Sequence, residues 1–575
     1  MVLAWLDAEL PARTALSDQS FDIRPKMVEA WIEQLPQADV SECARSLFET
    51  LKEINRLDYH YGVRIKALEL MREPTVEVIK ELQHHYSRQT FPLSLMRRRI
   101  SELGNALHDQ LSMGYLIALQ DLLHSKQFFR EAKTQALVLQ RAMYHFGGRA
   151  FVAYQTYSPV PKCIWTNLNQ LYEYSESQNL GNVPIIDMTD PFESKTSVMK
   201  QYLRIALASL ASPYRLQPGE IEQVDLHLAR WVSYCQLQPV SHEEIVDRYF
   251  VVDLNGGQPP GYAALNQCGH ACNCRMLNTE LMLSRLLEEL EQSRTEVEGD
   301  QSSQNGEMST GLYRGLIQAW GIMPQRNTER VLCDQETHVA FGLNNLHHFL
   351  WAELNGADDD TEFADHSQGK QKGARKMDAK RVQKKAAPNY RIETWLKINE
   401  SDTGCCLYNP SANESALRVG ELAGVLNEDQ GFNKWKLGVV RWIRSDGDGR
   451  EGLRIGIELI SDHAMAVAVT ARYEQEQCQS LEEYDRGLMV PCFDSEPAMY
   501  SLILPNLMYQ SEDKLRLAMR FTSRTCRLEE VLESTSAFTR FNYLVIDEME
   551  RSELMKEDKV GASSEEDFED IWAVI

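Results

Sequence analysis

The feature that most constrains how this chain can fold is a change of hydrophobic periodicity near residue 358. Before the change, apolar residues recur every three or four positions, as Leu47, Leu51 and Ile54 do, and this spacing is typical of amphipathic helices. After the change, short runs such as LRIGIELI and AMAVAVT are rich in β-branched residues and alternate with a period of two, which predicts strands. We therefore expect a multidomain α+β protein in which a large N-terminal α-helical array precedes strand-rich modules.

Proline and glycine positions refine the expected helical array. Pro36, Pro74 and Pro92 stand between amphipathic segments, where residues that interrupt helical hydrogen bonding are expected. Gly147 and Gly148 lie inside a long helical segment and predict either a bend or the close approach of another helix. The array contains no repeat of fixed period.

A charged segment marks the boundary between the helical and strand-rich parts. Almost no aliphatic residue occurs in it, and its charge changes from acidic to basic within a few residues, which is typical of an exposed linker. The sequence leaves open whether the last strand-rich module is a second barrel or an extension of the first. The expected parts are a helical domain (1–250), a helical and mixed connecting region (251–354) with a flexible segment near 292–310, the charged linker (355–388), an antiparallel β-barrel (389–475), a second strand-rich module (476–550) and an acidic tail (551–575).

Charge and composition exclude several classes of protein. Sixty basic and 84 acidic residues leave a formal charge of -24, which repels phosphate backbones and makes nucleic-acid binding unexpected. No uncharged apolar run approaches the ~20 residues of a membrane-spanning helix, and acidic residues near the N-terminus do not fit a secretory signal. We expect a cytoplasmic protein without membrane insertion, whose 12 cysteines form no disulfides.

The sequence carries no pattern that predicts a metal site or an enzyme. Cys268, His270, Cys272 and Cys274 are separated by single residues, whereas tetrahedral zinc sites use pairs separated by two to four residues. The chain has no nucleophile elbow, phosphate-binding loop, zinc-protease motif or dinucleotide-binding glycine pattern. We therefore expect neither a metal, nor a cofactor, nor catalysis.

The most specific short pattern is Asn399-x-Ser401-x-x-Gly404, which follows a predicted strand. Taken alone, these residue types predict a turn. A strongly basic stretch, which includes Arg375, Lys376, Lys380 and Arg381, precedes the pattern.

These elements, followed in order by LRVGELAGVL, WKLGVVRWIR and LRIGIELI, resemble the PilZ family of cyclic di-GMP receptors over roughly residues 375–472. The resemblance implies a bacterial protein with a six-stranded antiparallel barrel and a [D/N]-x-S-x-x-G motif that contacts the ligand. It also implies an R-x-x-x-R element before the barrel, whose arginines grip the phosphates and stack on the guanines. Between Gly369 and Asn399 no R-x-x-x-R occurs, and Lys376-x-x-x-Lys380 stands there instead.

The sequence thus predicts a bacterial signalling protein in which a PilZ-like barrel binds cyclic di-GMP and alters the interactions of the helical domain with a protein partner. Binding would order the basic linker against the barrel. The alternative is a ligand-independent scaffold or adaptor with a degenerate PilZ-like barrel, in which the basic stretch only solubilises the linker. The predicted ligand-binding residues are Arg375, Lys376, Lys380, Arg381, Asn399, Ser401 and Gly404.

Overall fold

The computed structural model divides the chain into two compact units. The first contains Met1–Asp334, Lys397–Val419 and Val440–Gly456, and the second contains Gln335–Leu396, Gly420–Val439 and Ile457–Ile575. The structure describes residues 10–125, 131–189, 194–240, 249–263, 273–297, 308–321, 329–355, 390–412, 415–427, 434–446, 452–471, 484–492, 499–519 and 522–546. The predicted linker from 356 onward and the predicted acidic tail lie outside these ranges.

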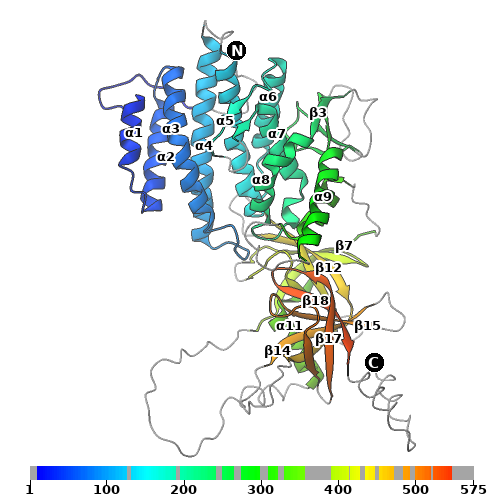
Figure 1. Ribbon diagram of the computed structural model, residues 1–575. Helices are drawn as coiled ribbons and strands as arrows, with labels where there is room; N and C mark the ends of the chain where they lie inside the picture. The colour runs from blue at the N-terminus through cyan, green and yellow to red at the C-terminus, as the bar shows by residue number, and fades with distance from the viewer. Residues whose placement is uncertain are drawn as a thin grey trace, which may run out of the picture. The chain divides into compact units, whose positions relative to one another are not determined.

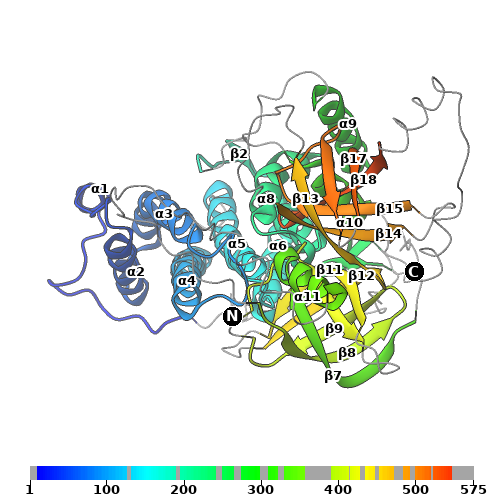
Figure 2. The same ribbon diagram turned by 90° about the horizontal axis from the view of Figure 1, so that it is seen from below.

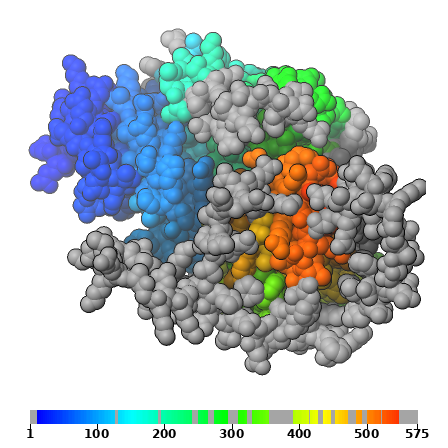
Figure 3. All heavy atoms as spheres, turned by 60° about the horizontal axis from the view of Figure 1, so that its bottom comes forward, coloured from blue at the N-terminus to red at the C-terminus, as the bar shows by residue number. Residues whose placement is uncertain are grey.

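The first unit begins with an array of helices that lie side by side, as Figure 1 shows from the side and Figure 2 along the helix axes. Polar N-caps define several starts, since the side chains of Asp39, Ser94 and Ser197 each accept a hydrogen bond from the first turn of a helix. In Figure 3 the helices α1 to α4 form one continuous blue surface. The helices are α1 (Pro25–Glu33), α2 (Val40–Arg56), α3 (Tyr61–Gln83), α4 (Leu95–His124), α5 (Ala132–Gln155), α6 (Lys162–Ser177), α7 (Val198–Leu210) and α8 (Glu220–Trp231).

Two sequence expectations for the array meet different outcomes. The expectation that Pro74 separates two helices is wrong, because α3 runs through it with buried residues on both sides of the proline. Burial of the helix on either side outweighs the hydrogen bond that proline removes. The close approach expected at the glycine pair is confirmed, since a Cβ on Gly147 would lie 2.6 Å from Ile205 and one on Gly148 would lie 2.2 Å from His108.

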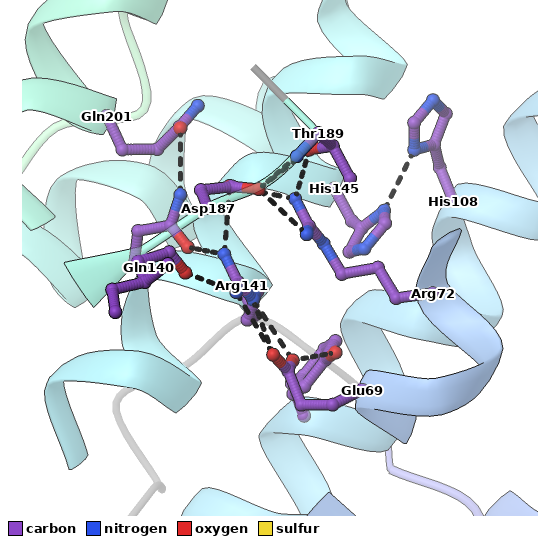
Figure 4. Close-up of polar contacts among 11 residues, drawn as sticks. Glu69, Arg72, His108, Gln140, Arg141, His145, Asp187, Thr189 and Gln201 are labelled. Atoms are coloured by element: carbon purple, nitrogen blue, oxygen red, sulfur yellow. Dashed lines mark hydrogen bonds and ion pairs between the residues drawn. The ribbon is translucent and has the colours of Figure 1, made fainter. Parts of the chain in front are cut away.

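A network of buried charges joins α3 and α5 to a short hairpin of β1 (Ile185–Ile186) and β2 (Lys195–Thr196) (Figure 4). Asp187 accepts two hydrogen bonds of 2.9 Å from Arg72 and a further one of 2.9 Å from Arg141. Arg141 also binds Glu69 at 3.0 Å. Burial alone would raise the pKa of Asp187, but the two guanidinium groups lower it to about 2, so this carboxylate stays ionised inside the array.

A four-stranded sheet, ordered β3-β6-β4-β5, follows the array. The apolar spacing of residues 276–291 predicts a helix, but Met276 belongs to strand β6 and the helix begins only at Glu280. Cys274, in β6, is disulfide-bonded, so the expectation that no cysteine forms a disulfide is wrong; its partner lies outside the described residues. The elements are β3 (Gln236–Pro239), β4 (Phe250–Asp253), β5 (Gly261–Tyr262), β6 (Cys274–Asn278), α9 (Glu280–Val297) and α10 (Thr310–Gly321).

A closed barrel follows, with the strand order β10-β11-β12-β9-β8-β7. Its strand β7 precedes the charged segment in sequence and pairs antiparallel with β10, with Val339 opposite Val425. The sequence predicts that the barrel starts after the charged segment, so the structure differs there by one strand. The strands are β7 (Val331–Phe341), β8 (Glu393–Ser401), β9 (Gly404–Asn409), β10 (Leu422–Asn427), β11 (Lys434–Ser445) and β12 (Leu453–Ser461).

A second closed barrel has the order β13-β14-β15-β18-β17-β16. It includes β13, the AMAVAVT run that the predicted range 389–475 assigns to the first barrel, because β13 pairs with β14 and β16. The expected fold class, a multidomain α+β protein with a helical array and two strand-rich modules, is confirmed. The strands are β13 (Met465–Ala471), β14 (Asp485–Cys492), β15 (Met499–Pro505), β16 (Lys514–Ala518), β17 (Ser523–Ser534) and β18 (Phe538–Val545).

Helix α11 (Leu343–Asn355) follows β7 and belongs to the second unit. Its Leu346 and Leu350 share one hydrophobic cluster with Leu422 of β10 and Leu488 of β14. The Nε2–H group of its His347 donates to the carbonyl oxygen of Val467 at 3.1 Å, and burial lowers the pKa of this histidine to about 4. Of the helices that the structure describes, none is both long and apolar enough to cross a membrane.

Replacing Asp187 by alanine should destabilise the array by about 3–5 kcal/mol, because it leaves Arg72 and Arg141 buried without their shared counter-charge. Unfolding of the full chain in urea, followed by helical circular dichroism, measures the loss. The control is Glu42→Ala, which removes the exposed ion pair with Arg45 and should cost at most about 1 kcal/mol. Equal losses in the two variants would contradict a structural role for the buried network.

As the pH is lowered, the array should begin to lose stability at a higher pH than the one at which carboxylates become protonated. The Nδ1 atoms of His108 and His145 lie 3.0 Å apart, and burial lowers the pKa of His108 to about 3 and that of His145 well below its usual value. Both remain neutral when folded but protonate near pH 6.5 when unfolded, so stability falls as the pH drops below about 6.5, by up to about 2.7 kcal/mol per pH unit for the pair.

Urea unfolding at a series of pH values between about 7 and 5 measures this slope. His108→Gln should remove about half of the contribution of this pair, because only His145 of the two then remains to take up a proton on unfolding. An unchanged slope in this variant would show that other groups set the acid sensitivity.

Candidate functional site

The hairpin between β8 and β9 contains the three predicted motif residues. Strand β8 extends through Asn399 to Ser401, and Gly404 begins β9, so the connecting turn is shorter than the pattern suggests. The Ser401 hydroxyl donates to the carbonyl oxygen of Gly404 at 3.2 Å and closes the turn. The structure therefore brings Asn399, Ser401 and Gly404 together in one rigid hairpin.

Asn399 carries an unused hydrogen-bond acceptor. It lies two positions before Ser401 on β8, so both side chains project from the same face of the strand. Its Oδ1 atom is buried and has no hydrogen-bond partner among the described residues. An unsatisfied buried acceptor costs about 1–3 kcal/mol, so this oxygen is suited to an N–H donor from a ligand.

An arginine at the start of β7 contributes positive charge to the same strands. Burial raises the pKa of the Cys406 thiol on β9, and the charges of Arg330 and Arg454 act against this rise. Arg330 is exposed and directly precedes β7, which is the neighbour of β8 in the barrel. Strands β7, β8 and β9 are adjacent in the barrel, so Arg330 and the Asn399 hairpin share one side of it.

A second set of polar side chains lies where β9 meets the β11–β12 connection. The Tyr408 hydroxyl donates to Asp446 at 2.8 Å, and the guanidinium of Arg454 lies 5.3 Å from the centre of the Tyr408 ring. The Nε atom of Arg454 is also 3.7 Å from Asp446. Gly452 must stay small here, because a Cβ would lie 2.2 Å from the Asp446 carboxylate.

The predicted basic residues Arg375, Lys376, Lys380 and Arg381 lie outside the described residues. Arg330, which directly precedes β7, is a further candidate that is absent from the residues predicted from sequence. The signal was present, because residues 326–330 read R-N-T-E-R, an R-x-x-x-R spacing directly before β7. It was missed because the first strand was expected after the charged segment; Arg326 itself lies outside the described residues.

Two loops of the helical array contact barrel segments within the first unit. Phe91 and Leu417 form an antiparallel bridge with hydrogen bonds of 2.8 and 2.9 Å. At the end of β11, the Ser445 amide donates to the carbonyl oxygen of Tyr157 at 2.8 Å. Since Ser445 directly precedes Asp446, the set of Tyr408, Asp446 and Arg454 is connected to the array through this hydrogen bond.

Comparison with known proteins relates the whole chain to one receptor family. The model described as "Cyclic-di-GMP receptor FimW, N-terminal domain" matches residues 26–242, the middle PilZ domain of the same receptor matches 249–356 and 351–466, and its C-terminal β-barrel domain matches 469–546. The cyclic-di-GMP receptor FimW of Pseudomonas aeruginosa is 24% identical in an alignment that covers 99% of this chain and 98% of that protein. No solved structure matches the chain.

The two segments matched by the middle domain include β7 as well as the strands β8 to β12. This agrees with the strand order of the first barrel, in which β7 closes the sheet between β8 and β10. The three matched domains follow each other in the order of the array, the first barrel and the second barrel. The chain therefore belongs to the PilZ-domain family, with the three-domain organisation of the FimW receptors.

Proposed function

We propose that this protein is a non-catalytic, cytoplasmic receptor for cyclic di-GMP that changes how its helical domain interacts with a protein partner. The observation that carries the proposal is the position of Arg330 and the Asn399 hairpin on adjacent strands of one barrel. The name of the Pseudomonas relative supports it.

The arrangement divides recognition between charge and shape. In PilZ receptors the R-x-x-x-R arginines hold the phosphates and stack on the guanines, and we assign this role to Arg326 and Arg330. A planar guanidinium suits both tasks, because it forms paired hydrogen bonds to phosphate and also packs on flat rings. The buried oxygen of Asn399 is then available to accept an N–H group of guanine.

The basic linker residues, Arg375, Lys376, Lys380 and Arg381, retain a secondary role in this proposal. Their charges raise the local concentration of an anionic ligand and need not grip it in a fixed geometry. Lysine serves this purpose as well as arginine, whereas it would replace arginine poorly in a bidentate site. The two basic segments therefore make different contributions that mutation can separate.

Transmission to the helical domain uses the contact between Ser445 and Tyr157. A ligand that repositions Arg454 or Tyr408 also acts on Asp446, to which both are bound, and hence on its neighbour Ser445. The Ser445 amide holds the loop that follows α5. A change at the barrel is thus passed to the array through consecutive residues, and a partner of the array experiences it.

Calorimetric titration of cyclic di-GMP into the full chain, with GTP as control, tests the proposal. The Arg326→Ala, Arg330→Ala double variant should weaken binding at least about 100-fold, since charge-assisted hydrogen bonds contribute about 1.5–3 kcal/mol each. The matched variant Arg375→Ala, Arg381→Ala removes the same charge and should weaken binding by less than about tenfold, mainly at low salt.

The pattern of losses distinguishes the assignments. A large loss of affinity only in the Arg375→Ala, Arg381→Ala variant would show that the charged linker makes the phosphate contacts. No heat of binding to the wild-type chain, together with no thermal shift at high nucleotide concentration, would contradict the receptor and favour the ligand-independent scaffold.

Substitutions at Asn399 test whether its oxygen reads the ligand. Asn399→Val removes the acceptor and should lower affinity about tenfold or more, whereas Asn399→Asp keeps an acceptor oxygen and should retain most of the binding. Ser401→Ala should weaken binding by loosening the turn, with a stability loss of only about 1 kcal/mol. Equal affinities for the valine and aspartate variants would show that Asn399 is purely structural.

A further inference from the structure

The first turns of α4 carry three arginines that have no evident structural role. Arg97, Arg98 and Arg99 occupy its first turns, at the end of the helix where the peptide dipole disfavours positive charge. Among the described residues, none of the three makes an ion pair, not even with Glu102 one turn later on the same helix. Their charge therefore remains available to a binding partner.

Two further arginines lie near this helix start. Because the bridge between Phe91 and Leu417 is antiparallel, Arg418 lies beside Thr90, two residues from Arg88. The six steps along the chain from Phe91 to Arg97 can span at most about 20 Å, so the bridge at Phe91 keeps these arginines within a limited distance of one another in the first unit. The Nε atom of Arg418 is buried without a hydrogen-bond partner in the described part of the chain.

Apolar side chains accompany this charge. Leu95 is 64% exposed and Met96 is 68% exposed, and both directly precede the arginine triplet. They are the first two residues of α4. We call the set Arg88, Leu95, Met96, Arg97, Arg98, Arg99 and Arg418 the arginine surface.

We propose that the arginine surface binds an acidic protein segment that carries apolar residues among its carboxylates. The formal charge of the chain is -24, and the five arginines have no ion pair among the residues that the structure describes, so this local group is complementary to an acidic partner. Protein interfaces are enriched in arginine and methionine and depleted of lysine, as this surface is. The guanidinium group also forms two parallel hydrogen bonds to one carboxylate. Membranes attract lysine equally, so the purely arginine composition favours a protein. This inference is independent of nucleotide binding.

A labelled peptide of repeated Glu-Glu-Leu units is the probe, and fluorescence anisotropy with the full chain is the measurement. We expect saturable binding that weakens at higher salt. The triple variant Arg97→Glu, Arg98→Glu, Arg99→Glu should weaken it at least about tenfold and should not unfold, because acidic residues suit a helix N-terminus. The double variant Leu95→Ser, Met96→Ser should weaken binding of this peptide but not binding of a Glu-Glu-Ser peptide, which has no apolar residue to contact these positions.

The matched control reverses three exposed lysines elsewhere on the array, Lys66→Glu, Lys80→Glu and Lys133→Glu, and so changes the net charge equally. Equal losses of peptide binding in the two triple variants would show that net charge alone causes the effect and would overturn the proposal.

Two other outcomes would also overturn it. Binding of phosphatidylglycerol vesicles through these arginines, without peptide binding, would identify a membrane surface. Self-association lost only in the arginine variant, with no peptide binding, would identify a second copy and likewise overturn it. Calorimetry with cyclic di-GMP on the same variants keeps the two proposals separate.

Discussion

The antiparallel pairing of β7 with β10 is the interaction on which the rest of the structure depends. With Val339 opposite Val425, a strand from before the charged segment closes a barrel whose other strands come after it. Without it the sheet would have two free edges, which expose unpaired backbone groups. The long insertion between β7 and β8 is tolerated because the entropy cost of closing a loop grows slowly with its length. As a direct result, Arg330, which directly precedes β7, belongs to a strand that neighbours β8.

The same insertion contributes structure of its own through α11. A Cβ on Gly424 of β10 would lie 2.3 Å from Leu346, so a glycine there lets the helix pack directly on the sheet. One turn of this helix also supplies His347, whose hydrogen bond to Val467 reaches a strand of the second barrel. Neutral histidine is required at this buried position, in agreement with its lowered pKa. In the second unit, α11 therefore joins strands of both barrels in one core.

The helical array is suited to be a rigid relay. Its interior holds an ionised Asp187 between two arginines, an arrangement that specifies one packing because any other leaves a buried charge unpaired. Loops at its ends meet the first barrel's segments at Leu417 and Ser445, and Phe91 packs edge-on against Tyr157 with ring centres 4.7 Å apart, which joins the two contacts. The arginine surface begins within a few residues of Phe91. The proposed nucleotide site, the proposed relay and the proposed arginine surface thus follow one another through neighbouring residues of the first unit.

The sequence by itself determined the class of each region, because hydrophobic period, glycine pairs and turn motifs act locally. It predicted the helical array, the strand-rich modules, the close packing at Gly147 and Gly148, and the Asn399-x-Ser401 hairpin. The tertiary structure alone decided which strand belongs to which barrel, since pairing between distant segments leaves no local periodic signal. For this reason β7 and β13 were assigned elsewhere and the R-x-x-x-R at 326–330 was missed. Burial on both sides of Pro74 likewise overrode its local tendency to end a helix.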